Sequence, residues 1–417
     1  MSRIVIISGF QVINNPRVAK EAAALAQAGH DVEVLGSILD LSSAQRTEAL
    51  LHGARWRYTP MVDLVQGSWL DRARWLRARL RVKGAQWLHR FLGWESSAQL
   101  GYFTRRLFHY AHTRQADLYI VHLEPALWVG VKLMQAGHKV AMDVEDWYSE
   151  DLLPADRAKR PMGKMKAYEA KLLQDAAYVT TTSQALSQAL ARAYQATPPA
   201  VVYNTFPWAE RDLLCGEVLD RQDPELVSLV WFSQTIGPGR GLEQLMQALH
   251  AVTQPFEIHL RGNPRPGMEA QLRALAPDFM QPHIYFHGVV PQAQLLARLA
   301  EHDIGFCGEL SDCPSRDLTI TNKSMEYLRS GLALVASDTA GQKELAEAVP
   351  QACFVYEQNQ PTSLANVLNM LLPSQKRLQQ AKQASLQAAM ATYSWEQDAK
   401  VLLEQVQKAL SQPSAQG

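Results

Sequence analysis

The chain has 417 residues, a length that favours two or three domains over one. Hydrophobic residues make up 47% and charged residues 20%, as in a globular protein with sizeable cores. The formal net charge of zero gives no general attraction to nucleic acid, and no run approaches the ~18 apolar residues of a membrane-spanning helix. We therefore expect a cytoplasmic protein without a nucleic-acid partner.

The two halves of the chain differ in charge. Residues 1–205 carry 25 Lys and Arg against 18 Asp and Glu, whereas residues 206–417 carry 16 against 23. An excess of positive charge in the first half suggests that this half meets something anionic. The four cysteines form no C-x-x-C pair, so the sequence predicts neither a disulfide framework nor a metal site.

Short β-rich runs alternate with helical patterns along the whole chain. Residues 3–8, 16–29 and 31–36 read as strand, helix ending in glycine, and strand. Near-continuous Val, Ile and Leu strands between helices are typical of parallel sheets covered on both faces. Further strands are expected at 117–122, 139–144, 177–181, 200–204, 229–233, 256–260, 283–287, 303–307, 332–337 and 353–356.

The strand pattern restarts after residue 206, so we predict an α/β protein with two Rossmann-like domains, residues 1–205 and 206–392. Parallel sheets of this kind bind ligands at the carboxyl ends of their strands. Two such domains facing each other would share a central cleft.

The segment from residue 72 to residue 94 is basic and rich in tryptophan. Between residues 71 and 90 there are seven Lys and Arg and one acid, interleaved with apolar residues. A basic amphipathic helix of this composition is typical of contact with an anionic membrane surface. The alternative is a solvated helix whose apolar face packs on its own domain.

Polar side chains gather where two strands of the first domain should end, namely His122, Glu124, Asp143, Glu145 and Asp146. Clustered acids at strand ends are costly unless they bind hydroxyl groups or have shifted pKa values. A single histidine is more often structural. Its place at the end of a strand favours a functional cluster here.

The stretch "SQTIGPGRGLEQL" contains Gly237, Gly239, Arg240 and Gly241 between a strand and a helix. Glycines let backbone N–H groups approach phosphates, and an arginine offers the forked charge that suits a diphosphate. The spacing fails both the dinucleotide fingerprint and the P-loop. A purely structural turn is the alternative interpretation.

The stretch "TITNKSMEYLRSG" opens a helix with Asn322, Lys323 and Glu326 close together. Free N–H groups and a lysine at a helix start form an anion site, and a carboxylate one turn on can accept hydrogen bonds from ribose hydroxyls. The alternative is an ordinary surface Lys–Glu pair, worth only ~0.3 kcal/mol.

These motifs, with "NPRVAKEAAALAQAGHDVEVL", "AAYVTTTSQALSQAL…PPAVVYNTF" and "YSWEQDAKVLLEQVQKAL", resemble the family 4 retaining glycosyltransferases of the GT-B fold, of the bacterial cell-surface polysaccharide and lipopolysaccharide type. The segments are spread over nearly the whole chain. The resemblance implies a C-terminal helix, residues 393–410, that crosses back to the first domain.

The resemblance implies transfer of a sugar from a nucleotide-diphosphate sugar, with UDP or GDP as the nucleotide, to a hydroxyl of a glycan or lipid-linked acceptor. No cofactor or metal is expected. The resemblance puts His122, Glu124 and Glu145 in catalytic roles. It implies that the acceptor is bound by Asn15, Arg17, Asp143 and Asp146. It implies that the donor is bound by Gly237, Gly239, Arg240, Gly241, Arg261, Asn322, Lys323 and Glu326.

The sequence departs from the family pattern at two places. Glu145 stands where many relatives have a histidine, and Leu318, next to Asp317, stands where relatives have a glutamate. Two alternatives to a transferase therefore remain at this point. One is a non-catalytic protein that binds a nucleotide sugar, and the other is a nucleotide-sugar epimerase. Besides a fully cytoplasmic location, we consider a peripheral one on the inner face of the cytoplasmic membrane.

Overall fold

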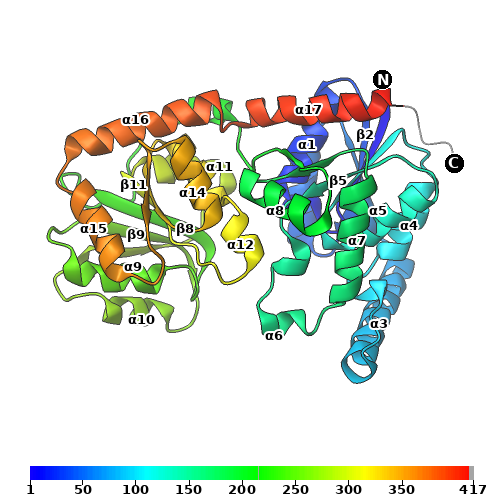
Figure 1. The fold of residues 1–417 in the computed structure, drawn as a ribbon, viewed down its shortest axis with the longest axis horizontal. Helices are drawn as coiled ribbons and strands as arrows, with labels where there is room; N and C mark the ends of the chain where they lie inside the picture. Colours follow the sequence, from blue (N-terminus) through cyan, green and yellow to red (C-terminus); the bar gives the residue numbers. More distant parts are fainter. Residues whose placement is uncertain (215, 413–417) are drawn as a thin grey trace. The chain divides into compact units, whose positions relative to one another are not determined.

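The structure is a computed structural model that describes residues 1–214 and 216–412 (Figure 1). Its contacts divide the chain into two compact units. Unit 1 holds Met1–Thr182, Leu186–Val202 and the chain from Ala399. Unit 2 holds Ser183–Ala185 and Tyr203–Asp398. Each unit is described by itself below.

Unit 1 is built on a seven-stranded sheet with the order β3-β2-β1-β4-β5-β6-β7, in which every pairing is parallel. The central strands β1 and β4 are apolar and almost completely buried, as expected of strands covered on both faces. The strands are β1 (Arg3–Ile7), β2 (Asp31–Ile38), β3 (Arg57–Asp63), β4 (Leu118–His122), β5 (Val140–Val144), β6 (Val179–Thr181) and β7 (Ala200–Val201).

Helices cover this sheet on both faces (Figure 1). In α1 the apolar residues recur at helical spacing and turn one face to the sheet, while Asn15 caps its first turn. The helices of this half are α1 (Pro16–Gln27), α2 (Leu41–Leu51), α3 (Trp69–Leu92), α4 (Thr104–His112), α5 (Leu123–Gln135), α6 (Pro154–Arg157), α7 (Met162–Asp175) and α8 (Gln184–Tyr194).

Unit 2 repeats this architecture with a six-stranded parallel sheet in the order β10-β9-β8-β11-β12-β13. Its two main apolar clusters include the buried Trp231, Phe256 and Tyr327. The strands are β8 (Ser228–Ile236), β9 (Glu257–Pro264), β10 (Ile284–His287), β11 (Ile304–Cys307), β12 (Ala333–Ser337) and β13 (Cys353–Tyr356).

The helices of unit 2 connect these strands in the same alternating way. They are α9 (Leu242–Ala248), α10 (Met268–Leu275), α11 (Gln292–Ala300), α12 (Pro314–Leu318), α13 (Asn322–Ser330), α14 (Ala340–Ala348), α15 (Pro361–Leu371) and α16 (Gln375–Ala391). The last helix, α17 (Trp395–Ser411), starts in unit 2 and ends in unit 1. Its end is fixed there by Lys139, whose Nζ donates to the carbonyl of Ala409 at 2.6 Å.

The structure confirms the α/β prediction with two parallel sheets and a C-terminal helix, and every expected strand is present within a few residues of its predicted bounds. The sequence analysis missed β3. This strand lies at the edge of its sheet, where Pro60 is tolerated because an edge strand leaves one row of N–H groups unpaired. Residues such as Arg57 and Pro60 break the apolar run that identified the other strands.

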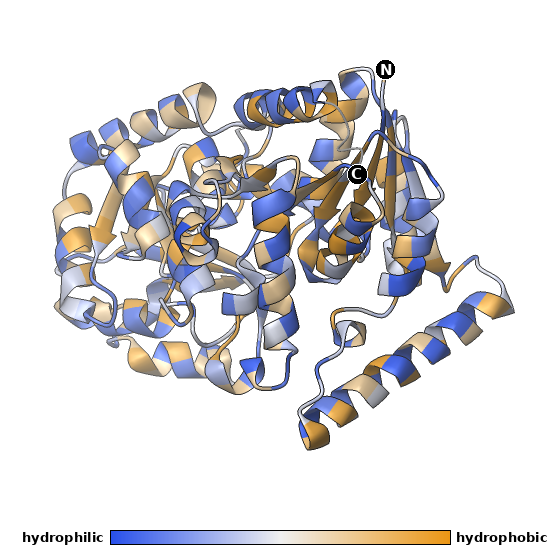
Figure 2. Cartoon of the chain, turned by 45° about the vertical axis from the view of Figure 1, so that its right-hand side comes forward, coloured by the Kyte–Doolittle hydropathy of each residue, from blue (hydrophilic) through white to orange (hydrophobic). Residues whose placement is uncertain are grey.

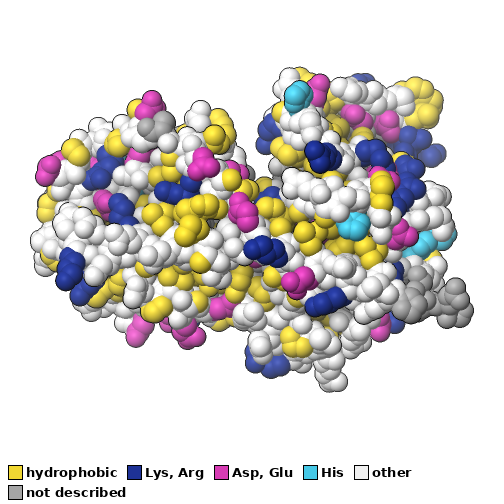
Figure 3. Space-filling view, turned by 90° about the horizontal axis from the view of Figure 1, so that it is seen from above, with side chains coloured by type: hydrophobic (Ala, Val, Ile, Leu, Met, Phe, Trp, Pro, Cys, Tyr) yellow, Lys and Arg dark blue, Asp and Glu magenta, His cyan; other side chains and the backbone are white. Residues whose placement is uncertain are grey.

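No helix in the described ranges combines the length and the apolar character needed to cross a bilayer. On the face drawn in Figure 3, lysine and arginine side chains lie among acidic and apolar ones, which fits a chain of zero formal net charge.

Candidate functional site

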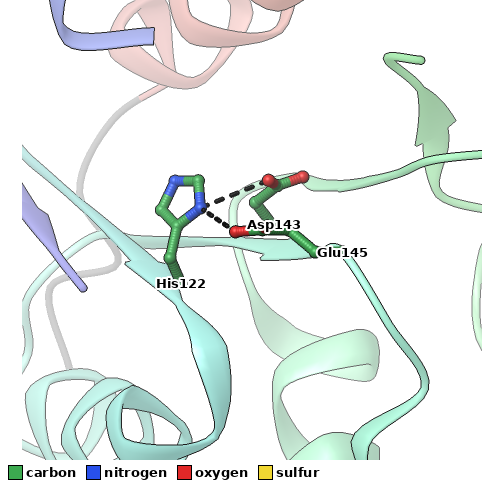
Figure 4. Close-up of side chains that lie close together, drawn as sticks. All are labelled: His122, Asp143 and Glu145. Carbon is green, nitrogen blue, oxygen red and sulfur yellow. Dashed lines mark hydrogen bonds and ion pairs between the residues drawn. The ribbon is translucent and has the colours of Figure 1, made fainter. Parts of the chain in front are cut away.

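The carboxyl ends of β4 and β5 bring three predicted side chains together (Figure 4). His122 is the last residue of β4, and its Nδ1 lies 3.2 Å from Asp143 Oδ2 and 3.3 Å from Glu145 Oε1. Asp143 belongs to β5, and Glu145 follows it. Because β4 and β5 are parallel neighbours with His122 opposite Asp143, the shared edge forces these groups into contact.

Helix α1 completes this cluster from the other side. Arg17 donates two hydrogen bonds to the Asp143 carboxylate, one from Nε at 2.5 Å and one from a terminal nitrogen at 2.8 Å. Glu21, one turn further along α1, places Oε2 2.5 Å from His122 Nε2. Asn15 caps α1 with its side-chain oxygen and donates from Nδ2 to Glu145 at 2.6 Å.

Burial and charge act against each other in this network, and charge prevails. Burial alone would lower the pKa of His122, but the carboxylates of Glu21, Asp143 and Glu145 outweigh it and raise the pKa well above 6.5. Burial alone would raise the pKa of Asp143. Arg17 and His122 outweigh it and hold that pKa well below its ordinary value. The carboxylates around the buried His122 therefore favour the protonated form of its imidazole.

The structure thus unites five of the predicted residues in one buried network, namely Asn15, Arg17, His122, Asp143 and Glu145. The side chain of His122 is 0% exposed, and both ring nitrogens face carboxylates. In this state the histidine orients its neighbours and presents no free nitrogen to solvent. Of the two remaining acids of the set, Asp146 lies in the half-buried loop after β5, and Glu124 lies in α5.

Glu124 is the predicted catalytic carboxylate with unused hydrogen-bonding capacity. It lies in the first turn of α5, and its Oε2 pairs with Arg160. Its other oxygen, Oε1, is buried and has no hydrogen-bond partner within the described part of the chain. Burial, partly opposed by Arg160, raises the pKa of Glu124 to about 6, which suits a group that exchanges protons near neutral pH.

The backbone between His122 and Glu124 is strained. Leu123 has φ = 66°, a left-handed conformation that is rare for a branched side chain. Its N–H donates to the hydroxyl of Tyr148 at 3.2 Å, which helps to hold the turn. Such strain persists where the surrounding structure fixes it, often at functional sites.

His122, Asp143 and Glu145 also offer ligand atoms that lie within 4.8 Å of one another, the geometry of a potential metal group. The oxygens of Asp143 already accept hydrogen bonds from Arg17 and from Thr180 Oγ1, the latter at 2.6 Å. Glu145 accepts one from Asn15. A metal ion here would have to displace the Arg17 guanidinium. The three side chains therefore fit an ion-pair network better than a metal site.

In unit 2 the predicted glycine loop joins β8 to α9. Gly239 and Gly241 have φ values of 74° and 72°, which only glycine adopts without strain. Gly241 also packs directly on Gly308, since a Cβ at residue 241 would lie 2.3 Å from the Gly308 carbonyl oxygen. The loop therefore presses against the end of β11.

Replacing Gly241 by alanine should displace this loop. We expect a lower Tm, because the new methyl group overlaps backbone that cannot yield, and at least tenfold weaker nucleotide binding if this loop binds the nucleotide that the sequence analysis predicts. Gly239→Ala is the matched control. Its φ is also positive, but its Cβ meets only the Asp312 carboxylate at 3.9 Å. Equal losses in both variants, measured by titration calorimetry and thermal unfolding, would contradict a role for the close approach.

The two predicted phosphate-binding cations converge on one carboxylate. Lys323 Nζ forms a short ion pair with Glu309 Oε1, and an Arg240 terminal nitrogen lies 3.5 Å from Glu309 Oε2. The Glu309 side chain is only 6% exposed. Burial alone would raise its pKa, but Lys323 and Arg240 outweigh it and lower the pKa. Two cations from different elements therefore meet beside the glycine loop.

Lys323 and Glu326 do not form the surface pair that was the alternative interpretation of this helix. Lys323 pairs with Glu309, whereas Glu326 pairs with Arg329 at 2.6 Å and accepts from Gln292 Nε2 at 3.2 Å. Glu326 is 1% exposed, and burial raises its pKa despite Arg329. It lies in the second turn of α13, while Asn322 is exposed at the helix start. Any ribose contact by Glu326 would need its carboxylate to be uncovered.

Arg261, also predicted to bind the donor, has protein partners in this structure. It lies in β9 and is 5% exposed. One of its terminal nitrogens forms a short ion pair with Asp220, and the other donates to the Gly288 carbonyl at 2.7 Å. These contacts give Arg261 a structural role in the fold of unit 2.

Leu318, which stands where the family pattern has a glutamate, and its neighbour Asp317 both form hydrogen bonds. The carboxylate of Asp317 accepts from Ser311 Oγ at 2.5 Å and from the N–H of Ala340 at 3.3 Å. The carbonyl of Leu318 accepts from Ser183 Oγ at 2.6 Å. Asp317 therefore helps to cap α14.

Three charged residues of these clusters were missed in the sequence analysis. Glu309 follows β11 by two residues, so the strand-end argument used for Asp143 would have found it. Arg265 follows β9, and its side chain lies against Gly237. Glu21 lies within a helix, and only its contact with His122 reveals it.

Comparison with known proteins assigns both halves of the chain. Residues 15–205 match the family described as "Glycosyl transferase 4-like domain". Residues 227–374 match the family described as "Glycosyl transferases group 1". No curated protein matches the sequence.

Solved structures share the fold at low sequence identity. Sucrose-phosphate synthase from Thermosynechococcus elongatus is 15% identical, with a TM-score of 0.67 over 98% of both chains. Anabaena HepE in complex with UDP is 16% identical, with a TM-score of 0.67 over 97% of this chain and 99% of that one. A Staphylococcus aureus TarM mutant in complex with Fondaparinux, alpha-GlcNAc-glycerol and UDP is 8% identical, with a TM-score of 0.67 over 99% and 100%.

At these identities the solved structures establish the fold, and the two family matches establish the type of activity. The parallel sheets of the two units carry the clusters described above at the carboxyl ends of their strands. The chain is a glycosyltransferase of the GT-B fold, with a glycosyl transferase 4-like domain followed by a glycosyl transferases group 1 domain.

Proposed function

We propose that this glycosyltransferase takes its sugar from a nucleotide-diphosphate sugar bound by unit 2. The observation that carries the proposal is the convergence of Arg240 and Lys323 on Glu309, beside the glycine loop. A guanidinium and an ammonium meeting at one point suit the two charged groups of a diphosphate. Two of the structurally similar proteins are seen with UDP, so UDP is the first nucleotide to expect.

Glu309 gives this site a resting state. Without donor, its buried carboxylate holds the two cations in place and offsets their mutual repulsion. A bound diphosphate brings more negative charge than one carboxylate can, and it can share or take over both cations. The site is therefore organised before the donor arrives, which lowers the cost of ordering long side chains on binding.

Departure of the nucleotide diphosphate develops negative charge on its leaving phosphate oxygen. Arg240 and Lys323 would stabilise that charge more strongly in the transition state than in the ground state, which is what accelerates the reaction. The anomeric carbon meanwhile becomes electron-poor, as in other glycosyl transfers with oxocarbenium-like transition states. Retention of configuration is part of the proposal, and the anomer of the product, read by NMR, tests it.

The acceptor side of the proposal is assigned to unit 1. Glu124 has a buried oxygen without a partner among the described residues and a pKa of about 6, so it can accept a hydrogen bond from an incoming hydroxyl and take up its proton. His122 and Asp143 act as positioning residues, since both are buried and fully engaged. We propose a glycan or lipid-linked acceptor, cell-surface polysaccharide biosynthesis as the process, and the cytoplasm as the location.

We also propose that the reaction needs no metal ion. The phosphate charge is met by Arg240 and Lys323, which supply the neutralisation that Mg²⁺ gives in other phosphate sites. The potential ligand group around His122 is already satisfied by Arg17 and Asn15. Turnover should therefore be unchanged in EDTA.

A thermal-shift panel tests the donor site directly. Purified protein is heated with UDP, GDP, ADP or CMP, each in EDTA and in Mg²⁺. A ligand that binds only the folded state must raise Tm. At a ligand concentration of a hundred times Kd, the free energy of unfolding rises by about 2.7 kcal/mol. We expect one nucleoside diphosphate, UDP, to raise Tm equally with and without metal.

The same panel on Glu326→Ala shows whether this buried glutamate reaches the nucleotide. Loss of the Tm shift with UDP in a folded variant would support ribose binding by Glu326. An unchanged Tm shift would mean that Glu326 serves the ion pair with Arg329 and does not bind the nucleotide. Absence of a shift for every nucleotide in the wild-type protein would contradict the proposed donor site.

A further inference from the structure

Helix α3 makes few contacts with the unit to which it belongs. Of its 24 residues, Ala78, Val82 and Ala85 are the buried ones. Trp75 adds ring contacts to Tyr102 and Phe103, at centroid distances of 4.7 and 5.7 Å. Figures 1 and 2 show a long helix that extends away from the sheet of unit 1. One face of the helix, with Ala78, Val82, Ala85 and Trp75, thus attaches it to unit 1, and the opposite face is exposed.

The opposite face of α3 carries the large apolar side chains. They recur at intervals of seven and four residues, which places them on one stripe of a helix with 3.6 residues per turn. This apolar stripe consists of Trp69, Leu76, Leu80, Trp87 and Phe91, with exposed fractions of 75%, 58%, 61%, 57% and 61%. A monomeric protein rarely leaves such a continuous row of large apolar side chains in water.

Cations border the apolar stripe mainly on one side. At 100° per residue, this border is formed by Arg72, Arg79, Lys83 and Arg90, while Arg77 lies nearest on the other side and Arg74 and Arg81 lie towards the packed face of the helix. Asp71, which pairs with Arg74 at 2.9 Å, is the single acid among the 24 residues of the helix. An exposed apolar row beside a row of cations, on a helix with a single acid, is the pattern of a helix that lies in the surface of an anionic bilayer.

We propose that α3 is a membrane-surface helix that docks unit 1 on an anionic lipid bilayer. The apolar stripe would enter the boundary between headgroups and acyl chains, while the bordering cations would meet lipid phosphates, with their aliphatic stems in the apolar layer. Tryptophan is a preferred residue at this depth, and the stripe contains Trp69 and Trp87.

Charge argues against a second copy of the chain as the occupant. The spacing of the stripe would also allow two α3 helices to pair, but each brings seven cations and one acid, so their borders repel. A neutral partner would leave the cations unmatched. An anionic bilayer satisfies both the apolar stripe and the cations beside it.

Docking itself does not depend on the proposed donor chemistry. Only its use, which is to bring the enzyme to an acceptor embedded in the membrane, rests on the proposed function. Vesicle binding measured without substrate therefore tests this inference alone, and the nucleotide panel tests the donor site alone.

The experiment measures co-sedimentation of the full-length protein with phosphatidylcholine vesicles, with and without phosphatidylglycerol. We expect binding only to the anionic vesicles. The triple variant Leu80→Ser, Trp87→Ser, Phe91→Ser should bind at least tenfold more weakly. Replacing Arg72, Arg79, Lys83 and Arg90 by glutamine should weaken binding at least as much and reduce its dependence on salt.

The control removes exposed apolar side chains from unit 2 instead, with Leu213→Ser and Phe279→Ser, which are 77% and 52% exposed in the wild type. It should bind like the wild type. Because all substituted residues are exposed, Tm should stay within a few degrees, which thermal unfolding verifies. The proposal is overturned if the wild type does not bind anionic vesicles, or if the triple variant of the apolar stripe binds them equally well. It is also overturned if sedimentation of the wild type shows a dimer that this triple variant no longer forms.

Discussion

Lys323→Gln is expected to lower kcat/KM for sugar transfer by about a hundredfold to a thousandfold, the usual cost of removing one charge-stabilising group. Lys323 forms an ion pair with Glu309 beside Arg240, where the proposed leaving phosphate would develop its charge. The effect should fall mainly on kcat, because the lysine stabilises charge that grows in the transition state. Steady-state kinetics with UDP-sugar as donor measure it.

A double variant separates donor binding from simple neutralisation of Glu309. If Lys323 serves only to balance that buried carboxylate, Lys323→Gln combined with Glu309→Gln should recover wild-type activity. If Lys323 holds the diphosphate, the double variant stays inactive. Lys376→Gln, on the exposed surface of α16, is the matched control and should leave kcat/KM unchanged.

Arg17→Gln is expected to lower the free energy of unfolding by about 3–5 kcal/mol, because it leaves the buried Asp143 carboxylate without its principal partner. Asp143 is 2% exposed, so water cannot replace the lost guanidinium. Urea unfolding of wild type and variant at neutral pH gives the difference. Arg192→Gln, on the exposed surface of α8, offers a control that should change stability little.

The pH dependence shows whether Asp143 is the cause. Its pKa in the folded wild type lies well below the ordinary 3.8, so its stabilising contribution is full above pH 3.8 and is lost as the pH falls towards the folded value. The difference between wild type and Arg17→Gln should therefore be constant above this range and shrink below it. A difference independent of pH would mean that Arg17 acts by packing alone. In that case Arg17→Gln with Asp143→Asn would be no more stable than the single variant.

Local sequence patterns predicted the elements of the fold well. Strands such as β1 and β4 are apolar over their whole length because both faces of a parallel sheet are covered. The first helix begins at Pro16 after the cap Asn15, and both residues are recognisable without a structure. The edge strand β3 escaped detection because an edge position does not demand a continuous apolar run.

Site residues on strand ends were also accessible from sequence, since parallel strands end at a common edge. This reasoning placed His122, Asp143 and Glu145 together, and the structure puts them within hydrogen-bonding distance. The same reasoning did not reveal which charges would pair. Arg261 forms an ion pair with Asp220, and Glu326 with Arg329. These partners depend on how separate elements meet.

The sequence by itself determined the two-sheet α/β architecture, the glycine loop and the helix starts, because these follow from local hydrogen bonding, backbone freedom and the period of apolar residues. The tertiary structure alone decided that Lys323 and Arg240 share Glu309, and that α3 packs through Ala78, Val82 and Ala85 while Trp69 and Trp87 stay exposed. Periodicity gives a helix its apolar stripe, but long-range packing decides which face is covered. A buried charged group pairs with the opposite charge that the tertiary fold places near it. The local sequence does not determine the distance between the two groups.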